Sequence, residues 1–211
     1  MLVEPADARL MRRCFELARA AVGRRELPFG SVIAREGVEI SGKGNGVREA
    51  RDVTRHAEVC AIVSAQQVIG RASLEGCTLY TNVEPCAFCS YAIREARIAR
   101  VVFALASPVM GGASRWDVLQ DPGLSRELPE VFAPPPAVMA GYMAEEADTL
   151  LRETSPMMWA MSRKRGLFTC EDVGRLGRAA APPDNLLGGL YASAMDILRR
   201  RFFDRFSRGT A

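Results

Sequence analysis

Two short stretches of the chain carry residue types that can hold a metal ion. The first contains His56 and Glu58, and the second contains Cys86 and Cys89 with two residues between them. His56 is the single histidine among 211 residues. Imidazole nitrogen and thiolate sulfur are ligands that zinc prefers, and a catalytic zinc site has three protein ligands and an open fourth position. His56, Cys86 and Cys89 therefore predict a site for Zn²⁺.

Glu58 has the chemistry and the spacing of an acid–base group beside such a metal. It follows His56 by two residues, which is about 200° around a helix, so the two side chains do not share a face. A carboxylate beside the metal, and not bound to it, can take a proton from water and pass it on. No second histidine exists for this role, which makes Glu58 the candidate catalytic residue.

Two other interpretations of these residues remain open. A CxxC pair can be a redox couple, although that role leaves His56 and Glu58 without a purpose. Cys60 follows His56 by four residues and lies on the same helical face, so a closed Cys₃His structural zinc site is stereochemically feasible. A buried cysteine on an amphipathic helix is more often a small apolar packing residue.

The elements that must position these residues alternate between helix and strand. A helix over 7–22 precedes a strand near 31–34, and Glu36-Gly37 makes the turn of a hairpin. Alternation of this kind predicts an α/β fold with helices on both faces of a mixed sheet. Further along, we expect a helix from Thr54 to Gly70, strand 77–83, helix 86–96, strand 98–105, strand 137–143 and a helix through Leu151. Residues 107–136, rich in glycine and proline, predict a long irregular segment of the kind that covers functional sites.

Composition places the chain among globular proteins. It is 48% hydrophobic and 25% charged, with no apolar run near the roughly 18 residues that a membrane span needs. The first 20 residues carry charges where a signal peptide needs an apolar segment. We therefore expect a cytoplasmic protein without a membrane role, in which stable disulfides are rare and a close cysteine pair indicates metal binding or catalysis.

Charge divides the chain into two predicted parts. Residues 1–153, the predicted catalytic domain, hold 18 basic and 20 acidic side chains, whereas residues 154–211 hold 10 and 5. In this C-terminal extension, Pro182-Pro183 precedes apolar residues at helical spacing, which predicts a basic amphipathic helix. Such a tail is typical of a packing arm or a solvated face, and less often of a nucleic-acid contact.

The order H-x-E followed by P-C-x-x-C resembles the cytidine deaminase-like zinc deaminase superfamily. The likeness covers roughly residues 7–153 and is closest to the branch of tRNA adenosine, guanine and cytosine deaminases. It is carried by LPFGSVIA, GNGV, TRHAEVCAI, LYTNVEPCAFC and ARIARVVFA. The resemblance implies a three-layer α/β/α sandwich with a five-stranded mixed sheet, assembled as a homodimer or larger homo-oligomer. It also implies that Asn45 hydrogen-bonds the base and that Phe29 stacks on it, although Asn45 also fits a turn and Phe29 a core position.

We expect from this resemblance a zinc-dependent hydrolytic deaminase of a free nucleobase or related amino-heterocycle, with guanine-like bases favoured by Phe29 and Asn45. The first alternative is a tRNA adenosine deaminase, for which nucleic acid would be the partner. A further alternative is a non-catalytic structural-zinc or binding protein on the same fold. The loop after strand 98–105 has no carboxylate before Asp117, unlike many guanine and tRNA deaminases. Trp116 and Trp159 are candidate pocket caps that also fit core positions.

Overall fold

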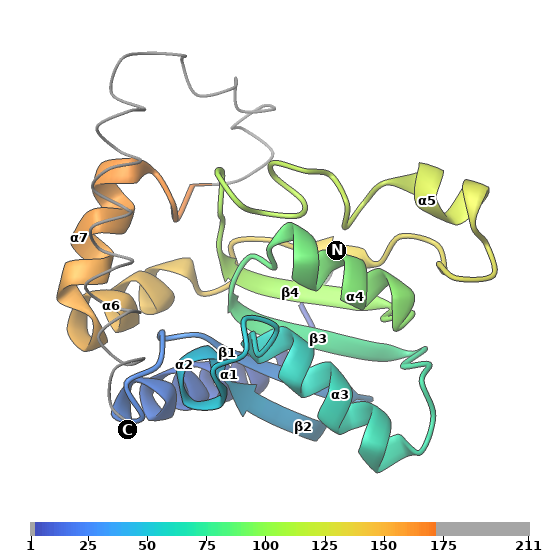
Figure 1. Cartoon of the computed structure of the whole chain (residues 1–211), viewed down its shortest axis with the longest axis horizontal. Helices are drawn as coiled ribbons and strands as arrows, with labels where there is room; N and C mark the ends of the chain where they lie inside the picture. The colour runs from blue at the N-terminus through green and yellow to red at the C-terminus, as the bar shows by residue number, and fades with distance from the viewer. Residues whose placement is uncertain (1–2, 172–211) are drawn as a thin grey trace, which may run out of the picture. The chain divides into compact units, whose positions relative to one another are not determined.

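The computed structural model describes residues 3–171, which are built around one five-stranded sheet (Figure 1). The strand order is β2-β1-β3-β4-β5. β1 pairs antiparallel with β2 and with β3, whereas β3–β4 and β4–β5 are parallel, so the sheet is mixed as predicted. The strands are β1 Gly30–Arg35, β2 Val38–Gly44, β3 Cys77–Val83, β4 Arg100–Leu105 and β5 Ala137–Met139.

Two of these strand boundaries follow from local backbone geometry. Glu36 and Gly37 both have positive φ, 51° and 74°, which is the conformation that a two-residue hairpin turn requires between β1 and β2. β5 is shorter than the expected strand 137–143. It ends at Met139 because Gly141 and Met143 take left-handed conformations that a strand cannot contain.

Helices cover both faces of the sheet, which confirms the predicted three-layer sandwich (Figure 1). Side chains of adjacent strand residues point to opposite faces. Val102 accordingly lies in the core under α1 and α6, and Val101 lies in the core under α3 and α4. The helices are α1 Asp7–Gly23, α2 Val47–Ala50, α3 Ala57–Ile69, α4 Ala87–Glu95, α5 Pro122–Glu127, α6 Ala144–Thr154 and α7 Pro156–Arg165.

The core under α1 and α6 extends past residue 153. The indole nitrogen of Trp159 in α7 donates to Asp148 Oδ1 of α6 at 3.0 Å. Phe168 is buried in the same core, and Thr169 exchanges two backbone hydrogen bonds with Ala106, the residue after β4. The expected amphipathic helix of the tail lies outside the described residues.

A buried arginine organises the irregular segment after β4. Arg94 of α4 is 1% exposed, and its guanidinium donates to the carbonyls of Val118 and Asp121 and to Ser125 Oγ at 2.6–3.0 Å. It also lies over the ring of Phe132, 5.9 Å from the centroid. The segment 107–136 is therefore fixed to α4, and α5 is the one helix within it.

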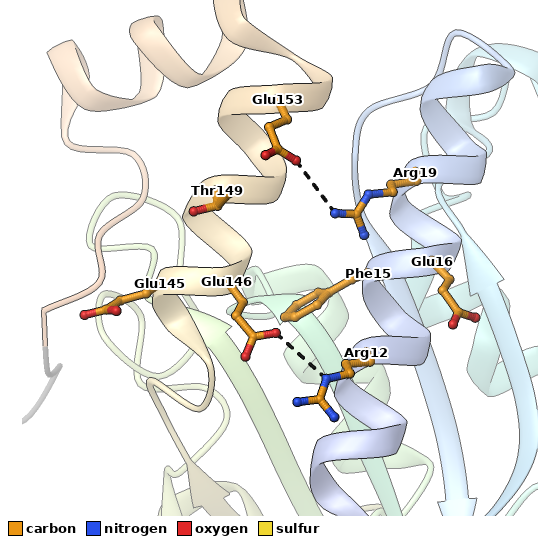
Figure 2. Close-up of a pocket in the computed structure, with 8 residues that line it drawn as sticks. All are labelled: Arg12, Phe15, Glu16, Arg19, Glu145, Glu146, Thr149 and Glu153. Atoms are coloured by element: carbon orange, nitrogen blue, oxygen red, sulfur yellow. Dashed lines mark ion pairs between the residues drawn. The ribbon is translucent and has the colours of Figure 1, made fainter.

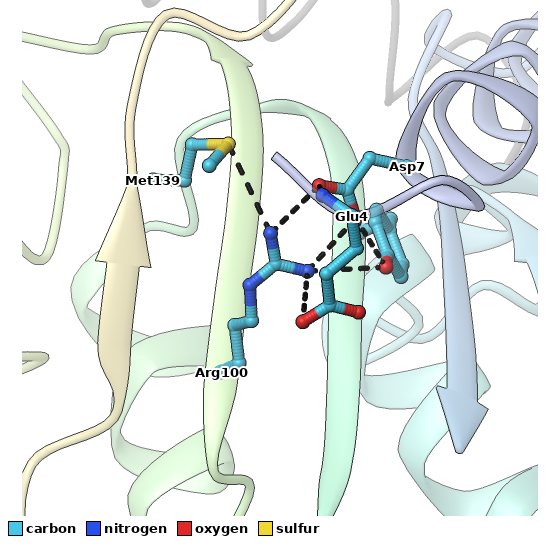
Figure 3. A network of polar contacts seen from close by, with 5 residues as sticks. Glu4, Asp7, Arg100 and Met139 are labelled. Atoms are coloured by element: carbon cyan, nitrogen blue, oxygen red, sulfur yellow. Dashed lines mark hydrogen bonds and ion pairs between the residues drawn. The ribbon is translucent and has the colours of Figure 1, made fainter. Parts of the chain in front are cut away.

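A second buried network joins the start of α1 to the start of β4 (Figure 3). Arg100 donates from both terminal nitrogens to the two carboxylate oxygens of Asp7, at 2.8 and 2.7 Å, and Tyr80 Oη donates to Asp7 Oδ1 at 2.8 Å. Asp7 has no exposed surface. Burial raises the pKa of Asp7, but hydrogen bonds from Arg100, from the backbone of Glu4 and from Tyr80 lower it further, and the pKa lies below its ordinary value.

No helix within residues 3–171 is both long and apolar enough to cross a membrane.

Candidate active site

His56 reaches the site from the residue just before a helix. α3 begins at Ala57, three residues later than expected, because Asp52 Oδ1 accepts hydrogen bonds from the backbone and hydroxyl of Thr54 and holds a turn there. His56 is the N-cap, with extended backbone angles of −63° and 149°. Its imidazole therefore projects past the N-terminal end of α3.

Cys86 and Cys89 occupy the matching end of α4. Cys86 is the N-cap of this helix and Cys89 is its third residue, immediately beyond β3 and Pro85. The unpaired N–H groups and the positive end of the helix dipole favour thiolates at these positions. α3 and α4 thus direct their N-termini to one place at the end of β3.

The three side chains form a cluster with the dimensions of a zinc site. His56 Nδ1 lies 3.6 Å from Cys86 Sγ and 3.3 Å from Cys89 Sγ, and all three donor atoms lie within 4.8 Å of one another. Tetrahedral zinc with bonds of about 2.0–2.3 Å separates its ligand atoms by about 3.3–3.8 Å. Among the described residues this is the group that can hold a metal, and Cys60 does not belong to it. Three donors without a fourth match an open catalytic site.

The acid–base state of the cluster favours a thiolate. A hydrogen bond from the Cys89 thiol and one from His56 outweigh burial and lower the pKa of Cys86 to about 4. The hydrogen bond to Cys86 in turn raises the pKa of His56 above its ordinary value. The hydrogen bond that the Cys89 thiol donates to Cys86, together with burial, raises the pKa of Cys89, so one proton remains within the pair of cysteines until a metal replaces it.

Glu58 lies beside this cluster in the first turn of α3. Its residue is 8% exposed, and burial raises the pKa of its carboxyl to about 7, against the lowering effects of its backbone hydrogen bond and of His56. Its carboxyl also interacts with the Cys89 thiol. A buried carboxyl in this position can hold a proton near neutral pH and release it to a neighbouring group.

The two predicted substrate contacts lie at the same end of the sheet. Asn45 is 2% exposed, its side-chain nitrogen donates to Glu26 Oε2 at 2.9 Å, and its backbone nitrogen donates to the carbonyl of Phe29 at 2.9 Å. Phe29 is half-buried and packs edge-to-face on Phe168, with ring centroids 5.9 Å apart. The next residue, Gly30, donates to the side chain of Asn82, the last residue but one of β3.

Comparison with known proteins identifies this arrangement. A family model described as the cytidine and deoxycytidylate deaminase zinc-binding region matches residues 5–105. The tRNA-specific adenosine deaminase of Aquifex aeolicus is 37% identical over 137 residues, which cover 64% of this chain and 85% of that protein. The chain belongs to the cytidine deaminase-like zinc deaminase superfamily. It is accordingly a zinc-dependent hydrolase of the deaminase class.

Solved structures show the same fold in deaminases of two kinds. One, from a study of A-to-I editing by tRNA:A34 deaminases at the wobble position of transfer RNA, has a TM-score of 0.58 and 32% identity. The aligned region covers 68% of this chain and 99% of the chain in that structure. The guanine deaminase from Nitrosomonas europaea has a TM-score of 0.56 and 26% identity, covering 73% and 86% of the two chains. The chain of this deaminase also matches the tRNA(Ile)-lysidine synthase of Deinococcus deserti with 36% identity, and the match spans 27% of the length of that synthase.

The structure of this deaminase also places the two tryptophans. Trp116 is 57% exposed in the loop after β4, with the guanidinium of Arg115 5.2 Å from its ring centroid. Trp159 is half-buried between α6 and α7. Trp159 therefore packs within the domain, and Trp116 is the one with a free face.

Three polar residues of this deaminase escaped sequence reasoning, namely Glu26, Asn82 and Glu84. All three are buried at the end of the sheet that carries the cluster, with exposures of 4%, 0% and 3%. Asn82 had a signal, because an amide inside the apolar run CTLYTNV is unusual in a central strand. Glu26 had no such signal in the sequence, since the residues around it follow neither a helical nor a strand periodicity.

A separate groove of about 580 Å³ lies between α1 and α6 of the deaminase, on the other side of the sheet from α3 and α4 (Figure 2). Phe15 forms part of its floor, and ion pairs Arg12–Glu146 and Arg19–Glu153 bridge the two helices. It contains none of the predicted site residues. The full lining is Arg12, Phe15, Glu16, Arg19, Glu145, Glu146, Thr149 and Glu153.

Proposed function

We propose that this deaminase converts adenosine in a tRNA to inosine at a zinc site held by His56, Cys86 and Cys89, with Glu58 as the proton carrier. The observation that supports the chemistry is a buried carboxyl next to a three-donor cluster with a free fourth position. The observation that supports the substrate is the 37% identity to a tRNA-specific adenosine deaminase across 85% of its length. This substrate was the alternative expectation from the sequence.

The residues of the chain then divide the reaction between them. Zinc, when bound, supplies the Lewis acidity that makes water nucleophilic near neutral pH. Glu58 accepts the proton that water loses as its oxygen bonds to C6 of the purine, and delivers that proton to the ring nitrogen N1. It then carries a second proton from the new hydroxyl to the amino group, the C–N bond breaks, and ammonia leaves. Water and adenosine thus yield inosine and ammonia without any redox change.

Free nucleobases, the main expectation from the sequence, become the second candidate substrate. Phe29 and Asn45 favour them, since both lie at the end of the sheet near the cluster and match residues that contact the base in guanine deaminases. The loop after β4 does not separate the two candidates, because it has no carboxylate before Asp117 and guanine and tRNA deaminases alike commonly carry one there. We propose for either substrate a homodimer or larger homo-oligomer.

A substrate panel separates the two candidates. The zinc-loaded protein is incubated with an RNA hairpin that carries a single-stranded adenosine in its loop, and in parallel with guanine, cytosine, adenine, their nucleosides and aminotriazines. Ammonia release is measured in each, with inosine measured in the RNA. We expect turnover with the hairpin and little with the small molecules. Turnover of guanine without RNA turnover would support the second candidate, and no ammonia from any of them would contradict both.

A further inference from the structure

Glu84 is a buried carboxylate whose described hydrogen-bond partners all come from one distant loop. It lies between β3 and Pro85, two residues before Cys86, and is 3% exposed. Its partners are Ser107, Ala113 and Ser114, which follow it by 23 to 30 residues. These three residues belong to the loop 107–114, which we call the clamp loop.

Both carboxylate oxygens of Glu84 are occupied by donors from this loop. Oε2 accepts from the backbone nitrogen of Ser107 at 2.6 Å and from Ser114 Oγ at 2.7 Å. Oε1 accepts from the backbone nitrogens of Ala113 at 3.0 Å and Ser114 at 2.7 Å. Backbone N–H groups can only donate, and hydrogen bonds to a carboxylate are roughly twice as strong as those between neutral groups. The site around Glu84 is therefore built for a carboxylate.

The same loop lies directly on a predicted metal ligand. Gly112 donates its backbone N–H to the carbonyl of Pro85 at 2.8 Å, and Gly111 forms an antiparallel bridge with Cys86. Neither glycine has room for a side chain. A Cβ on Gly111 would overlap the Glu84 carboxylate, and a Cβ on Gly112 would overlap the hydroxyl of Ser90 in α4. The loop backbone is thus packed between Glu84 and the first turn of α4.

We propose that Glu84 is a positioning residue that holds the clamp loop on Cys86 and thereby sets the zinc affinity of the site. This inference rests on the proposed zinc ligands. Loss of the carboxylate leaves three backbone donors in the loop without their acceptor, and the loop then separates from Pro85 and Cys86. Cys86 keeps its sulfur but loses the contact that fixes its backbone, so the three donor atoms are less well placed before zinc binds. Residues that orient metal ligands in this way typically contribute about 10- to 100-fold to metal affinity or activity.

Two substitutions break the contact from opposite sides. Glu84→Gln keeps the shape of the side chain but places an NH₂ group against backbone donors. Gly111→Ala leaves Glu84 intact and displaces its carboxylate with a methyl group, and the backbone of Gly111 needs no positive φ, so alanine adds only bulk. Glu95→Gln, on the exposed side of α4, is the matched control.

The measurement is the zinc dissociation constant of the full-length protein by competition with a chromophoric chelator, together with kcat and KM. We expect each single variant to bind zinc at least about 10-fold more weakly than the wild type. The double variant should lose little beyond either single variant, because both remove one shared contact. Glu95→Gln should match the wild type.

The outcomes separate this inference from the proposed function. A wild type that binds no zinc contradicts the proposed function itself. A wild type that binds zinc, with both variants within about two-fold of it and only their thermal stability reduced, assigns Glu84 a purely structural role and overturns the inference. If Glu84→Gln does not fold, Gly111→Ala decides by the same criterion.

Discussion

The proposed mechanism requires Glu58 for turnover but not for zinc binding. Its carboxyl is buried beside the cluster but is not one of the three donors. Glu58→Gln should therefore keep about one zinc per chain while turnover falls about 100- to 10,000-fold, the usual contribution of an acid–base group. Metal analysis and kcat on the same preparation test this. Comparable turnover in the variant would remove Glu58 from the mechanism.

Cys60 decides between an open and a closed metal site. It lies on α3, four residues after His56, and burial raises the pKa of its thiol. Because it is not part of the cluster, Cys60→Ser should retain full zinc content and activity. His56→Ala should lose zinc, since no other imidazole can replace it. Loss of zinc in both variants would instead support the closed Cys₃His site.

At the scale of elements, the segment after α7 adds an aromatic side chain next to Phe29, one of the two predicted substrate contacts. Thr169 pairs with Ala106, and Phe168, 8% exposed, packs on Phe29. Phe168→Ala should lower the free energy of unfolding by about 3 kcal/mol, the usual cost of a large cavity. It should also raise KM, because Phe29 loses the ring that fixes its orientation. Phe168→Leu, which fills most of the space, is the control for urea unfolding and kinetics.

Two results with Phe168→Ala would contradict this prediction. A stability loss with unchanged KM would assign Phe29 to the core and away from the substrate. An unchanged stability would mean that burial of the Phe168 ring contributes little to this domain.

The elements also show how far sequence reasoning reached. The alternation of helix and strand predicted the sandwich, and the His56, Cys86 and Cys89 donors came together because both helices begin at the same end of β3. Glu84 and Arg94 could not be predicted, since each stabilises an irregular loop through contacts to backbone atoms 20 to 40 residues away. Contacts to the backbone leave no mark in the residue types of the loop, and no periodicity relates the two partners.

At the scale of the whole molecule, the network of Asp7, Tyr80 and Arg100 ties the first helix to the centre of the sheet. The folded pKa of Asp7 is lowered, so its contribution to stability is present above the unfolded pKa of about 3.9 and is lost as the pH falls through the folded value. The free energy of unfolding should therefore decrease below about pH 4.

Asp7→Asn should remove part of this acid dependence and destabilise the protein at pH 7 by up to about 3 kcal/mol, because it removes the buried carboxylate from Arg100 and leaves the half-exposed Glu4 carboxylate at 3.5 Å as an ion-pair partner. Urea unfolding of the zinc-free protein between pH 3 and pH 7 measures both effects, and Glu95→Gln serves as the exposed control. A variant with the acid dependence of the wild type would show that other carboxylates cause it.

The net charge of the molecule bears on its proposed RNA substrate. Residues 1–171 hold 21 basic and 21 acidic side chains, so the net charge of +3 comes from residues 172–211. If this basic tail contacts tRNA, its deletion after residue 171 should weaken tRNA binding and flatten the dependence of affinity on salt, because fewer phosphate contacts release fewer counterions. The cut belongs after residue 171 and not after 153, since α7 and Phe168 pack on the domain. Binding titrations at several salt concentrations test this, with unchanged zinc content and unfolding midpoint as the controls for folding. An unchanged salt dependence would place the RNA contacts on the neutral domain itself and assign the tail a role in packing or assembly.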